Sequence, residues 1–321
     1  MPIVPSSYPG PPAFLFNGHL ETIVPSLYRK VNEVDYVRER IDTPDGDFLN
    51  LDWSKVGSNR LLIISHGLEG DSNRHYVKGL VKLFNQQQID VMVWNNRTCG
   101  GEINDLPILY HHGASYDLDT SIQYVLNTGA YTDIYLTGIS MGGAQTLKYL
   151  GEKSSDLPRE IKKAAVYSTP CNLPSSAATL KLKSNTFYKK RFLGKLKKKI
   201  AAKASQFPEL INLELLEKVK DFDSFDTLFT AKLHGFKDAA DFYQSVSADN
   251  WMKDISISTL IINAKNDPLL GPECYPIELA KKKPEIYLEM PDRGGHTGFL
   301  LKGNEFTWAE LRLLEFLIGK N

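Results

Sequence analysis

The sequence has few cysteines and no pair of them at metal-binding spacing. Cys99, Cys171 and Cys274 are the only three among 321 residues, and they lie far apart. An odd and sparse set does not build a disulfide framework, and no Cys-x-x-Cys indicates zinc. We therefore expect neither a disulfide-stabilised secreted domain nor a zinc module, and a reducing cytosol suits this cysteine usage best.

The sequence also lacks a long apolar run and an excess of charge. No run approaches the roughly 20 residues of a membrane span. The start, "MPIVPSSYPGPPAF", has no basic segment and no apolar core of signal-peptide length. Lys and Arg number 38, as do Asp and Glu, so the net charge is zero. These absences predict a cytoplasmic protein and give no reason to expect nucleic acid as a partner.

Short apolar runs rich in β-branched residues are present instead, and they are typical of buried parallel strands. They cover residues 61–65, 91–94, 134–137, 164–167, 260–263 and 286–288. Apolar residues at helical spacing follow several runs, and residues 306–318 form a last amphipathic segment. Strands that alternate with helices predict an α/β fold, with a mostly parallel sheet covered by helices on both faces.

Two segments depart from this alternation. Residues 36–40 and 48–53 flank a Pro-Asp-Gly turn and predict a hairpin. From about residue 171 to 246 there is no strand pattern, only helical and loop patterns. We interpret residues 1–321 as one α/β domain with a helical cap inserted at about 171–246.

The cap segment contains an unusually basic stretch. Residues 179–205 hold ten Lys or Arg and no Asp or Glu. Apolar residues recur every four positions from Phe192 to Ala204. The stretch predicts a cap helix with a solvated basic face, and the alternative is a helix that contacts an anionic lipid surface.

A Gly-x-Ser-x-Gly motif, "GISMG", lies between the run 134–137 and the next helical pattern. Strand, tight turn and helix in that order are the context of a nucleophile elbow. Ser140 would lie at a helix N-terminus, where the helix dipole favours negative charge. The alternative is a serine that only caps a helix. The context favours Ser140 as a nucleophile.

A serine hydroxyl needs a base and an acid that orients the base. Asp267 follows the run 260–263, and His296 lies in a glycine-rich loop after the run 286–288. The carboxyl ends of parallel strands meet at one edge of a sheet. We therefore expect Ser140, Asp267 and His296 to form a catalytic triad, although each residue alone would suit an ordinary loop.

The chemistry also requires N–H donors for the oxyanion. Met141 follows the serine, and its N–H is one predicted donor. The loop "HGLEG" after the first parallel run supplies the other, for which we expect the Leu68 N–H, with Gly67 as the alternative. Adjacent His111 and His112 seldom converge on one ion, so we interpret them as loop histidines and expect no metal or cofactor.

These segments together resemble a known family. "HGLEGDSNRHY", "LTGISMGGAQTLKYLGE", "INAKNDPLL" and "DRGGHTGFL" are similar to the YheT-like, or embryogenesis-associated protein-like, branch of the α/β-hydrolases. The resemblance covers nearly the whole chain, including "FNGHLETIVPSLYRK". It departs at Thr98, where a glycine is common. It implies a capped α/β-hydrolase fold, a triad on Ser140, Asp267 and His296, and carboxylic ester substrates, often lipid acyl esters.

The sequence therefore predicts a serine hydrolase that cleaves small acyl esters through an acyl-enzyme. An acyltransferase that passes the acyl group to an alcohol would use the same triad. A non-catalytic binding protein on a hydrolase fold is the third hypothesis, which the presence of all three triad residue types disfavours.

Overall fold

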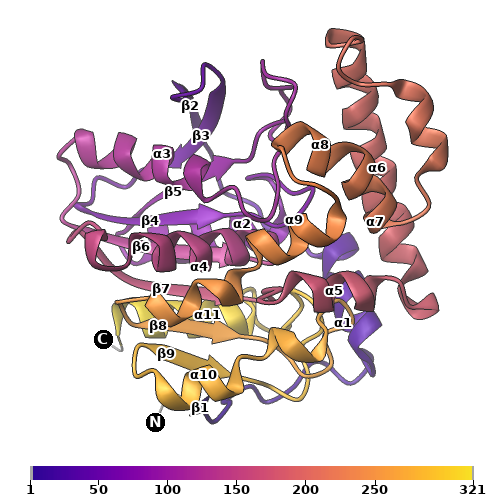
Figure 1. Cartoon of the computed structure of the whole chain (residues 1–321). Helices are drawn as coiled ribbons and strands as arrows, with labels where there is room; N and C mark the ends of the chain where they lie inside the picture. The colour runs from indigo at the N-terminus through magenta and orange to yellow at the C-terminus, as the bar shows by residue number, and fades with distance from the viewer. Residues whose placement is uncertain (1–2, 320–321) are drawn as a thin grey trace.

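One nine-stranded sheet forms the centre of the protein, in the order β1-β9-β8-β7-β6-β4-β5-β3-β2 (Figure 1). The computed structural model describes residues 3–319. The strands are β1 (Ile3–Val4), β2 (Val37–Asp42), β3 (Phe48–Ser54), β4 (Arg60–Ser65), β5 (Asp90–Asn95), β6 (Asp133–Ile139), β7 (Ile161–Tyr167), β8 (Thr259–Ile262) and β9 (Ile286–Glu289). Neighbours are parallel except in the pairs β2–β3 and β3–β5. The predicted mostly parallel sheet and its hairpin are confirmed.

Helices cover both faces of the sheet, because alternate residues of each central strand point to opposite sides. In β4, Leu61 and Ile63 join one core, while Leu62 and Ile64 join the other. The first core is closed by α3 (Ser115–Asn127), α4 (Met141–Lys153) and α10 (Ile277–Lys282), and the second by α2 (His75–Gln86) and α11 (Trp308–Ile318). A further helix near the N-terminus, α1 (Gly18–Tyr28), contacts α6 (Thr186–Gln206) through His19 Nδ1, which is 3.1 Å from Tyr188 Oη.

Between β7 and β8 the chain forms a group of helices that we call the helical insertion, residues 168–258. It contains α5 (Leu173–Leu180), α6 (Thr186–Gln206), α7 (Phe222–Phe225), α8 (Ala231–His234) and α9 (Ala239–Val246). The long α6 stands at the edge of the molecule in Figure 1. Its stripe residues Leu196, Ile200 and Ala204 are buried in a core that the insertion shares with Leu109. The apolar stripe therefore packs against the protein itself.

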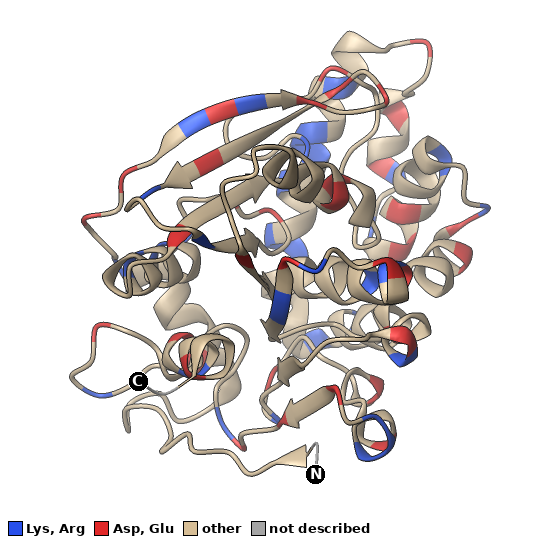
Figure 2. Ribbon diagram, turned by 90° about the vertical axis from the view of Figure 1, so that its left-hand side faces the viewer, with Lys and Arg blue, Asp and Glu red and all other residues tan. Residues whose placement is uncertain are grey.

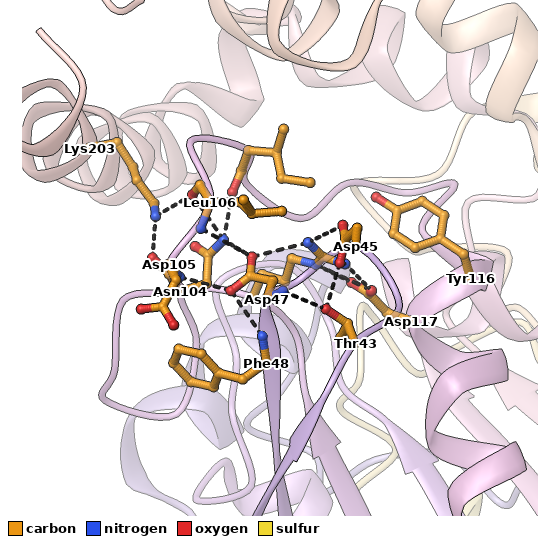
Figure 3. Close-up of polar contacts among 12 residues, drawn as sticks. Thr43, Asp45, Asp47, Phe48, Asn104, Asp105, Leu106, Tyr116, Asp117 and Lys203 are labelled. Carbon is orange, nitrogen blue, oxygen red and sulfur yellow. Dashed lines mark hydrogen bonds and ion pairs between the residues drawn. The ribbon is translucent and has the colours of Figure 1, made fainter.

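The basic face of α6 is only partly solvated, so the sequence prediction is wrong for two of its lysines. Lys203 is fully buried, and its ammonium donates to the carbonyl oxygens of Asn104 and Leu106 (Figure 3). Lys199 pairs with Glu69 at 2.9 Å, and its side chain is only 18% exposed. A run of lysines in the sequence indicates a positive charge. It does not indicate which of the side chains are buried against carbonyl or carboxylate groups of the folded protein.

A buried polar network connects α6 to the β2–β3 hairpin (Figure 3). Asn104 donates to the Asp47 carboxylate at 2.5 Å. Arg97, just past β5, holds Asp45, Asp47 and Asp117 at 2.7 to 3.0 Å. Each buried carboxylate therefore has a cationic or amide partner, as burial of charge requires.

Acidic and basic residues are interspersed elsewhere along the ribbon (Figure 2), in keeping with the zero net charge. Within residues 3–319, no helix combines the length and the apolar character needed to cross a bilayer.

Five of the seven histidines have a pKa below the ordinary 6.5, mainly because burial disfavours the charged ring: His66, His75, His111, His112 and His234. The unfolded chain therefore binds more protons than the folded chain below about pH 6.5. Stability falls as the pH drops from 6.5 towards the folded pKa values, which are near 4 for three of these rings.

His75 offers a test, since its pKa is lowered to about 3 and neither ring nitrogen has a hydrogen-bond partner among the described residues. We expect His75→Leu to gain about 2 kcal/mol of stability relative to the wild type between pH 7 and pH 5. Urea denaturation at both pH values measures this difference. A wild-type-to-variant difference that is the same at pH 7 and pH 5 would contradict the assignment.

Candidate active site

The chain turns from β6 into α4 at a single residue, Ser140. Its φ of 57° and ψ of −121° lie in a region that residues with a side chain rarely adopt. The Ser140 N–H donates to the Tyr167 carbonyl at 3.1 Å, and its carbonyl accepts from the Gly143 N–H at 2.9 Å. The turn is therefore held on both sides, with the Ser140 side chain at the carboxyl edge of the sheet.

The glycines that flank Ser140 are required by close backbone contacts. A Cβ added to Gly138 would lie 2.3 Å from the Gly142 carbonyl oxygen. A Cβ added to Gly142 would lie 2.1 Å from the carbonyl oxygen of Ser65, at the end of β4. The motif therefore lets α4 begin directly against the neighbouring strand.

The three residues predicted as a triad lie together. His296 Nε2 is 2.9 Å from Ser140 Oγ, and His296 Nδ1 is 2.8 Å from Asp267 Oδ2. Because a carboxylate only accepts, Nδ1 carries the ring proton and Nε2 presents a lone pair to the serine hydroxyl. Asp267 Oδ1 accepts from the Leu269 N–H at 2.8 Å, and the Asp267 side chain has no exposed surface.

Helix α1 holds the loop that carries His296, which sequence reasoning missed. Thr22 Oγ1 accepts from the His296 N–H at 2.8 Å and donates to the Gly18 carbonyl at 2.6 Å. Asn17 caps the helix by accepting from the Leu20 N–H. That Asn cap is the signal in the sequence, but Pro25 inside the segment obscures the helical pattern.

Glu21, the neighbour of Thr22, is the second contact between α1 and this loop. Its carboxylate accepts from the Gly294 N–H at 2.5 Å and from Arg293 Nε at 2.7 Å, and Glu21 is 1% exposed. Asn266 donates to Glu21 at 3.1 Å and accepts from the Gly295 N–H at 3.0 Å. One buried carboxylate thus joins the loop before His296 to the loop before Asp267.

The loop after β4 approaches Ser140 from the other side. A Cβ added to Gly67 would be 3.2 Å from the Ser140 Cβ. Within residues 3–319, the N–H groups of Leu68 and Met141 donate to no acceptor. By contrast, the Gly67 N–H donates to Tyr76 Oη at 3.2 Å. Two unpaired donors beside a serine hydroxyl are what an oxyanion would need.

His66 fixes the conformation of this loop. It is fully buried, its Nε2 accepts from the Asn96 N–H at 3.1 Å, and its Nδ1 faces the Gly67 carbonyl at 2.8 Å. A backbone N–H only donates, so the ring proton lies on Nδ1 and is donated to Gly67. Burial lowers the His66 pKa to about 4, which keeps the ring neutral in this arrangement.

The residue after Leu68 connects the loop to α6. Glu69 has a φ of 55°, and its carboxylate accepts from Tyr110 Oη at 2.6 Å and pairs with Lys199 at 2.9 Å. Lys199 Nζ is also 3.1 Å from Cys99 Sγ. Burial raises the pKa of the Cys99 thiol to about 11, so this cysteine is held as a neutral thiol.

Two pockets meet at Ser140, and both are lined by Leu68, Phe192, Leu269 and His296. The apolar pocket extends towards α5 and is lined further by Leu173, Ala177, Leu180 and Leu270. The arginine pocket extends towards α1 and is lined further by Ser26, Arg74, Tyr188 and Arg191. The described residues contain no group of three or more His, Cys, Asp or Glu side chains suited to a metal ion.

Comparisons with known proteins agree with this geometry. Residues 60–303 match the family defined by the alpha/beta hydrolase fold. The chain is 31% identical to YheT of Escherichia coli (strain K12), named as a candidate esterase, over 94% of this chain and 90% of that protein. It is 27% identical to Phospholipase ABHD3 of Homo sapiens, over 93% of this chain and 75% of that protein.

The fold is also that of a solved esterase. The Pyrococcus furiosus esterase Pf2001 aligns with a TM-score of 0.58 and 16% identity, over 97% of each chain. The chain therefore belongs to the α/β-hydrolase fold family. Its similarity to YheT confirms the branch that the sequence motifs indicated, and its relatives carry the names of enzymes that hydrolyse esters.

Two helical glycines provide a matched test of the turn at Ser140. We expect Gly142→Ala to destabilise the protein by about 3 kcal/mol or more, because its Cβ would collide with the Ser65 backbone. A Cβ on Gly194, in α6, meets nothing within 4 Å, so Gly194→Ala should stabilise by about 1 kcal/mol. Urea denaturation measures both, and similar effects from the two variants would refute the close contact.

The carboxylate of Glu21 provides a second test. Glu21→Gln keeps the shape but leaves Arg293 and the Gly294 N–H with a weaker acceptor, and we expect a loss of about 2 to 3 kcal/mol. The control is Glu278→Gln, which removes an exposed pair with Lys281 and should leave the free energy of unfolding nearly unchanged. Equal urea midpoints for the two variants would show that Glu21 does not anchor the loop.

Proposed function

We propose that the protein is a serine hydrolase of carboxylic acyl esters, with Ser140, His296 and Asp267 as its triad. The observation that carries the proposal is the His296 ring, which bridges Ser140 Oγ and the Asp267 carboxylate at 2.9 and 2.8 Å. Names of the relatives, among them a phospholipase, support ester chemistry of this kind.

In the proposed reaction, Ser140 Oγ attacks the ester carbonyl while its proton passes to His296 Nε2. Asp267 accepts from Nδ1–H and stabilises the imidazolium. The N–H groups of Leu68 and Met141 donate to the oxyanion. The C–O bond to the alcohol then breaks, and the alcohol leaves with the proton from Nε2. Water, deprotonated by the same nitrogen, releases the acid and restores Ser140. No metal or cofactor takes part in these steps.

The apolar pocket is the proposed site for the acyl group, because Leu173, Ala177 and Leu180 of α5 line it beside Ser140. We propose that the helical insertion acts as a cap of the same domain, since Phe192 of α6 lines both pockets. In this arrangement the insertion sets the length of acyl chain that the pocket accepts.

The nucleophile is tested with p-nitrophenyl esters from acetate to palmitate. We expect hydrolysis that peaks at one chain length and falls by about 10³-fold or more in Ser140→Ala. Ser256→Ala is the control, because this exposed serine donates to the Ser154 carbonyl away from the pockets. Hydrolysis that persists in Ser140→Ala would overturn the mechanism.

Labelling by a fluorophosphonate probe adds a readout that does not depend on the choice of ester. The wild type and Ser256→Ala should be labelled and Ser140→Ala should not. Failure to label the wild type would favour the binding-protein hypothesis. Ethyl ester formed in the presence of ethanol would show acyl transfer to an alcohol through the same acyl-enzyme.

A further inference from the structure

The two sides of the candidate active site differ in charge. The apolar pocket has one carboxylate among its lining side chains, Asp226, which is 9% exposed and accepts from Tyr243 Oη at 2.8 Å. Burial raises the pKa of Asp226 to about 6, so the group is mainly ionised at neutral pH. The arginine pocket is lined instead by two cations, Arg74 and Arg191, and by no carboxylate. A substrate across Ser140 would thus meet negative charge at one end and positive charge at the other.

The two arginines have no acidic partner among residues 3–319. The Arg74 side chain donates to Ser26 Oγ at 3.3 Å and to the Tyr76 hydroxyl, whereas the Arg191 side chain makes no hydrogen bond or ion pair. Three largely buried arginines, Arg29, Arg97 and Arg312, each pair instead with a buried carboxylate, and the half-buried Arg60 donates to a backbone carbonyl. An unpaired guanidinium in a pocket is therefore an exception in this protein.

The side chains around the arginine pocket carry an excess of positive charge, which favours the binding of an anion. Burial, and then the charge of Arg74, lower the pKa of Arg191. Burial also lowers the pKa of Lys195, and Arg74 and Arg191 contribute to the shift. Glu69, the carboxylate that acts on Lys195, is already paired with Lys199 at 2.9 Å. An incoming anion would relieve repulsion among these cations.

We propose that the arginine pocket binds an anionic group, a carboxylate or a phosphate, on the alcohol portion of the ester, with Arg74 and Arg191 as its ligands. The planar guanidinium fork matches both groups. Because Asp226 repels an anion in the apolar pocket, the charge also fixes which end of the ester enters which pocket. This inference rests on the proposed ester hydrolysis. It narrows the substrate class to esters whose alcohol portion carries a carboxylate or a phosphate.

The binding test uses Ser140→Ala, so that it does not depend on turnover. Calorimetry compares 1-butyrylglycerol 3-phosphate with 1-butyrylglycerol, which lacks the phosphate. We expect the phosphate ester to bind at least tenfold more tightly, and Arg74→Gln/Arg191→Gln to abolish the difference. Lys190→Gln, a charge change at an exposed position that does not line the pocket, should preserve it. Equal dissociation constants for both ligands in Ser140→Ala overturn the proposal.

The kinetic test uses the active protein and separates carboxylate from phosphate. The ratio of kcat/KM for 3-carboxy-4-nitrophenyl butyrate to that for 4-nitrophenyl butyrate measures the preference for a carboxylate. The ratio of kcat/KM for 1-butyrylglycerol 3-phosphate to that for 1-butyrylglycerol measures the preference for a phosphate. We expect at least one ratio to exceed ten and to fall to about one in Arg74→Gln/Arg191→Gln, mainly through KM. Partial recovery in Arg74→Lys/Arg191→Lys would identify charge as the cause. Hydrolysis with both ratios near one refutes this inference while leaving the proposed hydrolase intact.

Discussion

Ser140 stands in a left-handed conformation because the chain must pass from β6 into α4 without losing contact with the strands on either side. Such a backbone costs about 1 to 3 kcal/mol, which the surrounding structure must offset. Two hydrogen bonds offset part of this cost, one from the Ser140 N–H to the Tyr167 carbonyl and one from the Gly143 N–H to the Ser140 carbonyl. In addition, Gly142 packs against the Ser65 backbone. Every other group of the site is placed relative to this turn, including the His296 ring and the unpaired N–H groups.

Helix α6 is attached by lysines to the loops that follow β4 and β5, while its apolar stripe packs in the core of the insertion. Lys199 pairs with Glu69, the residue after Leu68, while Lys203 reaches the carbonyl oxygens of Asn104 and Leu106 (Figure 3). These contacts couple the position of α6 to the loop beside Ser140. A displacement of α6 would have to break an ion pair adjacent to a proposed oxyanion donor, so the wall of the pocket and the donor geometry are linked.

Much of the fold and the positions of three site residues could be predicted from sequence, since parallel strands leave a strong apolar signal and Ser140, Asp267 and His296 each follow such a strand. The contacts of Glu21 and Thr22 could not, because they join residues more than 270 positions apart and no local pattern reports such a pairing. The burial of Lys203 was also unpredictable, since its partners are backbone carbonyls, which every residue type supplies equally.

The dependence of the His296 loop on α1 has a consequence for synthesis of the chain. Thr22 and His296 are 274 positions apart, so α1 leaves the ribosome long before the loop that it supports. Until residues 293–296 emerge, the Glu21 carboxylate keeps its water shell and α1 has no complete binding surface. The nascent protein can form most of its sheet in this interval. The candidate active site is complete only when residues 293–296 contact α1. Appearance of the proposed ester hydrolysis would therefore report that residues 293–296 have docked on α1, and not merely that the core has folded.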